Sequence, residues 1–170
     1  PNRRSHAPGS STVPQHVSLP PFQTFFDQHR RAVHRFLVAH VGPGEADDCF
    51  QETFLSALRA YPRLNGESNL RAWIFTIAHR KGIDAHRSRA RRATPTEALP
   101  EASVEPPPAP EPRLWEEVRR LPSKQRATVL LRYLNDLPYA EIGRILGTSE
   151  EAARQNAHHG IKRLREVWKP

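Results

Sequence analysis

Apolar residues recur at helical spacing along most of the first half of the chain, and this pattern predicts helices. The first stripe occupies residues 22–41 over about five turns, and 42–44 (GPG) break it. The second stripe lies within 46–61, and a third helix starts near Leu70, after a polar loop at 65–69. The second stripe consists of Phe50, Phe54, Ala57, Leu58 and Tyr61.

Within the last third of the chain, Leu137–Leu164 has the pattern of a helix-turn-helix. Gly147 fits a left-handed corner, and the Ser149 hydroxyl can cap the next helix. Pro138 suits a first helical turn, and Gly143 allows the two helices to touch. A plain helical hairpin with a solvated outer face fits the same pattern. The expected buried side of the second helix is Ala153, Ala157, Ile161, Leu164 and Trp168.

Composition favours a polyanionic partner and divides the chain. The net charge is +8 and the pI about 10.5. Residues 93–112 hold seven prolines, four glutamates and no Lys or Arg, so they should sustain neither helix nor strand. We therefore predict an all-α protein with two small helical domains, 22–92 and 113–170. The acidic Pro/Glu-rich linker acts as a stiff tether between them, and 1–21 form a disordered tail.

Several classes of function find no support in the sequence. There is no nucleophile with a base and an orienting acid, no phosphate-cradling loop and no metal cluster, so we expect no enzyme, cofactor or small-molecule substrate. Without a signal-like or membrane-spanning run, we expect a cytoplasmic protein with no membrane insertion. Cys49 should be a small buried side chain. His79 and His86 can share a helix face, but they lack further metal ligands.

Two charged surfaces of the first domain are candidates for binding. The second helix presents an acidic face near its start, although acids there also simply suit the helix dipole. The third helix ends in a basic run that exceeds what capping needs, and it favours phosphate binding. Trp73 and Phe75 precede this run and could hold unstacked bases, although Trp73 also fits a core position. The basic run is Arg80, Lys81, Arg87, Arg89, Arg91 and Arg92.

These residues resemble the bacterial sigma-70 family, and specifically its extracytoplasmic-function (group 4) RNA polymerase sigma factors. Three ordered motifs carry the resemblance, which covers 22–92 and 114–165. They are Ala46–Phe54 (ADDCFQETF), Leu70–Ile74 (LRAWI) with Ile83–Asp84, and Leu121–Pro122 through Leu130–Tyr133 (LLRY) to Tyr139–Ile142 (YAEI). The resemblance implies a sigma-2 helical bundle and a sigma-4 helix-turn-helix.

For the first domain, the resemblance implies contacts with core RNA polymerase and with the minus-10 promoter element. The helix with the acidic face would dock on the β′ coiled coil. The loop before the third helix and that helix's polar face would capture an unpaired minus-10 base, at a cost of a few kcal/mol for unstacking. The polymerase-binding residues would be Asp47, Asp48, Gln51, Glu52 and Phe54. The minus-10 residues would be Glu67, Ser68, Asn69, Trp73, Arg80, Lys81, Asp84 and Arg87.

For the second domain, the resemblance implies minus-35 recognition in the major groove. Arginine pairs with guanine and glutamine with adenine, so Arg154 and Gln155 suit base edges. The minus-35 residues would be Glu150, Arg154, Gln155, His158, His159, Lys162 and Arg163. The recognition helix departs from the family pattern G-T-V-K-S-R-L-H-R-A and has glycine at 160. A common family asparagine of the third helix falls at Arg80.

The resemblance also implies further partners and function. Besides promoter DNA and the β′ coiled coil, the expected partners are the polymerase β flap and an anti-sigma factor. The acidic linker would thread the polymerase channel. The expected function is promoter-specific transcription initiation with assistance in strand opening. Two alternatives stay open: a stand-alone helix-turn-helix regulator, and a sigma-like protein that binds polymerase without directing initiation.

Overall fold

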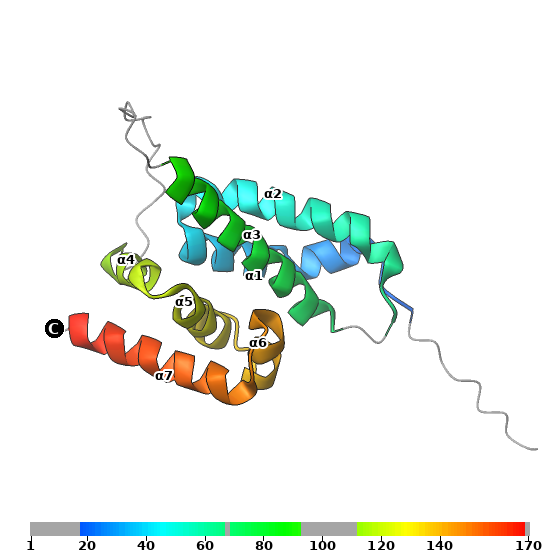
Figure 1. Cartoon of the computed structure of the whole chain (residues 1–170). Coiled ribbons are helices and arrows are strands. Elements are labelled where there is room, and N and C mark those ends of the chain that lie inside the picture. Colours follow the sequence, from blue (N-terminus) through cyan, green and yellow to red (C-terminus); the bar gives the residue numbers. More distant parts are fainter. Residues whose placement is uncertain (1–17, 67–68, 93–111, 169–170) are drawn as a thin grey trace, which may run out of the picture.

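The computed structural model describes residues 18–66, 69–92 and 112–168, and these ranges contain helices and no strand. Residues 93–111 of the predicted linker and 1–17 of the predicted tail lie outside the described residues, whereas Pro112, predicted as the last linker residue, already opens α4. The helices form the two groups shown in Figure 1, and we call 18–92 the N-terminal unit and 112–168 the C-terminal unit. Their helices are α1 Phe22–Val41, α2 Pro43–Ala60, η1 Tyr61–Arg63, α3 Leu70–Arg92, α4 Pro112–Arg120, α5 Ser123–Val129, η2 Leu130–Leu134, α6 Tyr139–Leu146 and α7 Glu150–Val167.

The N-terminal unit is a three-helix bundle in which α1, α2 and α3 contact one another. Phe25 and Phe36 are fully buried in its core, as the helical spacing predicts. Phe75 is fully buried as well, so the sequence-based suggestion that it could hold an unstacked base is wrong. The break between α1 and α2 is shorter than predicted. Gly42 alone leaves helical geometry, with a φ of +94°, and Pro43 already opens α2, because the first turn of a helix needs no N–H from that residue.

The C-terminal boundary of the predicted tail, residue 21, lies too late in the sequence. Leu19 packs against the hydrophobic core, and the carbonyl of Pro20 accepts a hydrogen bond of 2.7 Å from the Tyr61 hydroxyl. The carbonyl of Pro21 accepts from the amide of Phe25 at 3.1 Å. The described residues just before α1 therefore belong to the folded unit.

The C-terminal unit packs α7 against both α5 and α6. A π-helical turn at Leu130–Leu134, which the sequence pattern did not predict, continues α5. Gly160 lies where α7 crosses α5, and a Cβ there would lie 2.8 Å from Cγ2 of Val129. This close approach accounts for a glycine in mid-helix that costs about 1 kcal/mol in helix propensity relative to alanine.

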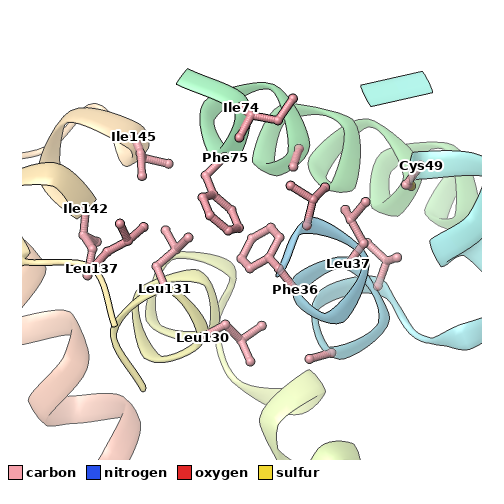
Figure 2. Packing of buried hydrophobic residues seen from close by; sticks show 14 of the residues in the cluster. Phe36, Leu37, Cys49, Ile74, Phe75, Leu130, Leu131, Leu137, Ile142 and Ile145 are labelled. Carbon is pink, nitrogen blue, oxygen red and sulfur yellow. The ribbon is translucent and has the colours of Figure 1, made fainter. Parts of the chain in front are cut away.

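The two units are packed together, and this differs from the predicted pair of tethered domains. The N-terminal unit contacts the C-terminal unit through α1 with α4, α1 with η2, and α3 with α6. One continuous apolar cluster includes Phe36 and Phe75 from the first unit and Leu131 and Ile142 from the second, as Figure 2 shows. Composition predicted the boundary between the units, but it carried no information on the apolar surface that each unit presents to the other.

Candidate nucleic-acid and partner interfaces

The acidic face of α2 is open to solvent. Asp47, Asp48, Gln51 and Glu52 are all exposed, on the opposite side of α2 from the residues that pack in the core. The side chain of Asp47 accepts a hydrogen bond of 2.9 Å from His34 Nε2, which ties this face to α1. An exposed carboxylate cluster on a rigid helix is suited to a basic protein partner.

Phe54 and Leu58 both belong to the predicted apolar stripe of α2, but only Phe54 is buried. Phe54 was predicted to bind polymerase, but it is 6% exposed and packs edge-on against Phe26, so it holds α2 in the bundle. Leu58 was placed in the buried stripe, yet it is 50% exposed, as Leu55 is at 47%. These two leucines add apolar area to the solvent-facing side of α2, which is typical of a protein-binding surface.

The predicted minus-10 residues of α3 form one stripe. Trp73, Arg80, Asp84 and Arg87 are spaced by seven, four and three residues, so they share a helix face. The three charged residues are exposed. Trp73 is half-buried, and its ring lies 5.8 Å from that of Phe25, so it combines a core contact with partial access. Glu67 and Ser68 lie outside the described residues.

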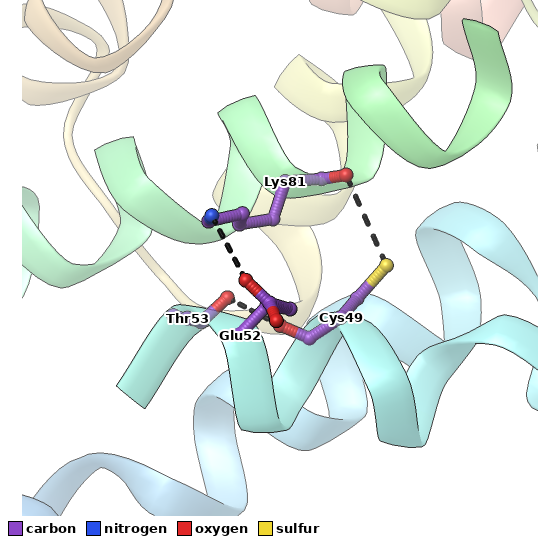
Figure 3. Close-up of polar contacts among 4 residues, drawn as sticks. All are labelled: Cys49, Glu52, Thr53 and Lys81. Atoms are coloured by element: carbon purple, nitrogen blue, oxygen red, sulfur yellow. Dashed lines mark hydrogen bonds and ion pairs between the residues drawn. The ribbon is translucent and has the colours of Figure 1, made fainter. Parts of the chain in front are cut away.

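Lys81 departs from this stripe and joins α3 to α2. Its Nζ lies 3.2 Å from Oε2 of Glu52, and its carbonyl faces the Cys49 thiol at 3.9 Å (Figure 3). Thr53 donates a hydrogen bond of 2.6 Å to the Cys49 carbonyl in the same group. Burial, followed by the nearby Glu45 and Asp48 carboxylates, raises the pKa of Cys49 to about 11, so its thiol is a weak nucleophile at neutral pH.

The helix-turn-helix has the geometry that its sequence predicts. Gly147 adopts a left-handed conformation with a φ of +63°, and the Ser149 hydroxyl accepts a hydrogen bond of 3.1 Å from the amide of Ala152. A Cβ on Gly143 would lie 2.8 Å from the carbonyl oxygen of Thr148, so the tight corner requires glycine there. Trp168 differs from its prediction, because it ends α7 and is 40% exposed.

All seven predicted minus-35 residues of α7 are exposed. Glu150 pairs with Arg154, whose guanidinium also lies over the Tyr139 ring, 5.3 Å from its centroid. Gln155 donates a hydrogen bond of 3.4 Å to Glu151 one turn earlier. The side chain that suits guanine is thus held in place before any DNA arrives. Tyr139 entered the sequence analysis only as part of a family motif, and its contact with Arg154 was not predicted.

One predicted minus-10 residue contacts the helix-turn-helix instead of solvent alone. Asn69 Oδ1 accepts a hydrogen bond of 3.0 Å from the amide of Ala72 at the start of α3, while its Nδ2 donates one of 2.9 Å to Glu141 Oε1 on α6. Arg71 donates to the carbonyl of Asn135 close by. The C-terminal unit therefore contacts the start of α3 through Glu141 and Asn135. No local sequence pattern indicates this contact.

Neither a metal centre nor a membrane span emerges from the described part of the chain. Within 18–66, 69–92 and 112–168, no group of three or more His, Cys, Asp or Glu residues could hold a metal ion. No helix in those ranges combines the length and the apolar character that crossing a bilayer needs. The adjacent His158 and His159, with ring centroids 5.8 Å apart, stand on the exposed face of α7.

Comparison with known proteins identifies both units. Residues 25–92 match the Sigma-70 region 2 family, and residues 112–164 match the Sigma-70, region 4 family. The chain is 33% identical over 156 residues to RNA polymerase sigma factor CarQ of Myxococcus xanthus, covering 86% of this chain and 88% of CarQ. It is 34% identical over 152 residues to ECF RNA polymerase sigma factor SigD of Mycobacterium tuberculosis, covering 81% and 72% of the two chains.

The fold has counterparts among solved structures. The sigma factor RpoE of Bartonella quintana, crystallised with the anti-sigma factor NepR, superposes with a TM-score of 0.73 at 20% identity, covering 86% of this chain and 95% of that one. With the family matches over both units and the relatives above 30% identity, the chain belongs to the extracytoplasmic-function sigma factors of the sigma-70 family, and it is a promoter-directing sigma factor.

Proposed function

We propose that three surfaces of this sigma factor each have their own partner in the initiation complex: the acidic face of α2, the stripe of α3 and the exposed face of α7. The observation that carries the proposal is that a helix-turn-helix with an exposed polar face and an α2 with an exposed acidic face occur in one chain. The face of α2 with Asp48, Gln51 and Glu52 would bind the β′ coiled coil of core polymerase. The C-terminal unit would contact the β flap.

The promoter would be read at two places. The α3 stripe, with the residues just before it, would hold the minus-10 strand, and the exposed face of α7 would enter the minus-35 major groove. Base edges would be contacted by Arg154 and Gln155, and phosphates by Lys162 and Arg163, which fix orientation without reading sequence. Strand opening would use binding energy to keep a base outside the stack.

In this proposal the chain binds polymerase and promoter DNA and catalyses no reaction itself. It would do so in the cytoplasm, where polymerase and chromosome meet. An anti-sigma factor is the expected regulator, since RpoE of Bartonella quintana is seen in complex with NepR. Such a partner would act by covering the α2 face or the DNA-binding faces. The hydrogen bond of Asn69 to Glu141 must also break before minus-10 DNA can use Asn69.

Selection of DNA by the complex tests this function. The full chain is mixed with core polymerase and a library of forked promoter fragments, and the retained DNA is sequenced. We expect enrichment of two separated elements that requires both proteins. Enrichment of one motif by the chain alone would indicate a stand-alone regulator. Polymerase binding without enrichment would indicate a sequestering protein.

Replacing Arg154 should impair promoter choice and leave polymerase binding intact. Arg154→Ala removes a side chain that suits guanine, so we expect discrimination at one minus-35 position to fall by about 1 to 3 kcal/mol. Competition binding of the polymerase complex to selected and altered elements measures it. Arg165→Ala is the matched control, because it removes one exposed cation of α7 outside the predicted reading set. Equal loss of discrimination in both variants would contradict the assignment.

A further inference from the structure

A buried arginine of the C-terminal unit lies beside a group of histidines in the N-terminal unit. Arg126 on α5 is 6% exposed, and no carboxylate of the described residues pairs with it. Its guanidinium donates instead to the Arg119 carbonyl and, at 2.9 Å, to Nε2 of His86 on α3. A buried charge held by a carbonyl and a neutral ring is sensitive to any further charge placed beside it.

His86 Nε2 has two neighbours that make opposite demands on it. Arg126 Nη2, at 2.9 Å, can only donate a hydrogen bond, whereas the His40 carbonyl oxygen, at 3.2 Å, can only accept one. To accept from Arg126, Nε2 must carry its lone pair, so the ring is neutral with its proton on Nδ1. A proton on Nε2 would turn that atom into a donor to His40 and set it against the N–H of Arg126.

The surroundings would not offset a positive charge on this ring. One carboxylate, Glu45, is present, and it already lies 3.7 Å from Arg89. The other titratable and charged groups around His86 and its partners are basic. By element, the whole set is His40 on α1, Glu45 on α2, His79, Arg80 and Arg89 on α3, Arg119 on α4 and Arg126 on α5.

We propose that His86 is a proton-operated latch between the two helical units. Neutral His86 holds Arg126 and keeps the units packed, while protonated His86 donates to the His40 carbonyl, repels Arg126 and lets the C-terminal unit separate. Separation would break the hydrogen bond between Asn69 and Glu141 and uncover the start of α3. The latch proposal concerns the distance between the two units. It can therefore be tested independently of the proposed DNA contacts.

The direction of the pH effect follows from linkage. Burial, and then Arg126, lower the pKa of His86 in the packed arrangement. Separation of the units would let the pKa of His86 approach the ordinary histidine value of about 6.5. The separated form then binds more protons below pH 6.5. Packing is therefore fully stable above that pH and weakens as pH falls, by up to about tenfold per pH unit for one proton.

Energy transfer between two dyes on the full chain measures the separation. Gln28→Cys on α1 and Glu166→Cys on α7 give exposed thiols, one on each unit. Cys49 can stay, because it is buried and its pKa is about 11. We expect constant transfer above pH 7 and a decrease as pH falls from 6.5 to 5, with unchanged helical circular dichroism. Constant transfer, or a parallel loss of helix, would overturn the latch.

Three variants separate His86 from general acid effects. In His86→Gln an amide can accept from Arg126 and donate to the His40 carbonyl without titrating, so the units should stay packed at pH 5, with at least a tenfold smaller open fraction than the parent. His86→Lys should be open already at pH 7.5. His158→Gln, which changes an exposed histidine of α7, should open as the parent does. An equal acid response in His86→Gln and the parent would overturn the proposal.

A second measurement needs no variant. Nitrogen NMR of the unmodified chain at pH 7.5 should show His86 with its proton on Nδ1 and a hydrogen-bonded lone pair on Nε2. A proton on Nε2 at that pH would mean that Arg126 is not held as described, and would overturn the latch.

Discussion

Asp48→Arg is expected to weaken binding to core polymerase by about 30-fold, or about 2 kcal/mol. Asp48 is exposed on the α2 face beside Gln51 and Glu52, where a partner with complementary positive charge would meet it. Reversal replaces attraction by like-charge repulsion at that contact. Because the residue is exposed, the fold should persist. Titration of labelled core polymerase at moderate salt measures the affinity, and circular dichroism checks the fold.

The matched control for this charge reversal is Asp27→Arg. Asp27 is an exposed aspartate of α1 outside the α2 face, and its change alters the net charge equally. We expect its polymerase affinity to stay within about twofold of the parent, as an exposed pair contributes little. The same loss in both variants would mean that net charge, rather than the α2 face, governs binding.

Gly82→Ala is expected to destabilise the N-terminal unit by about 2 kcal/mol, even though alanine is the better helix former. A Cβ at position 82 would lie 2.5 Å from Cδ2 of His40 and 3.3 Å from Cγ1 of Val41. His40 is fully buried and stacked on Phe36, with ring centroids 5.1 Å apart, so it has little room to move. Denaturant unfolding followed by circular dichroism measures the change.

Gly44→Ala is the matched control, since it makes the same substitution in a helix of the same unit. No atom lies within 4 Å of a Cβ built at Gly44, and the free energy of unfolding should be unchanged or slightly raised. Gly82→Ala at parental stability would show that His40 can shift, and it would remove the argument for tight packing between α1 and α3.

Local rules predicted the local parts of the structure well. The corner at Gly147, the cap at Ser149 and the close contact at Gly143 depend on neighbours within a few residues, and all three are confirmed. The helical spacing likewise predicted the burial of Phe25 and Phe36. Such features need only the period of the helix and the chemistry of its ends.

Contacts across the two units could not be predicted in this way. A charged residue such as Arg126 is assigned to the surface by composition, yet it is buried against His86 from a distant part of the sequence. The linker composition indicated a tether, although the units share a core. Helical phase predicted which side chains of α7 are exposed. It also placed Phe54 in the apolar stripe, where it is buried, whereas the family resemblance had implied a polymerase contact for it.

Run-off transcription with purified core polymerase across a promoter library, with and without the full chain, tests the central claim most directly. If this chain directs initiation through two promoter contacts, new start sites should appear only in its presence, preceded by two shared elements at a fixed spacing. Substitution of either element should abolish those starts. An identical set of starts with and without the chain, despite its binding to polymerase, would contradict the account.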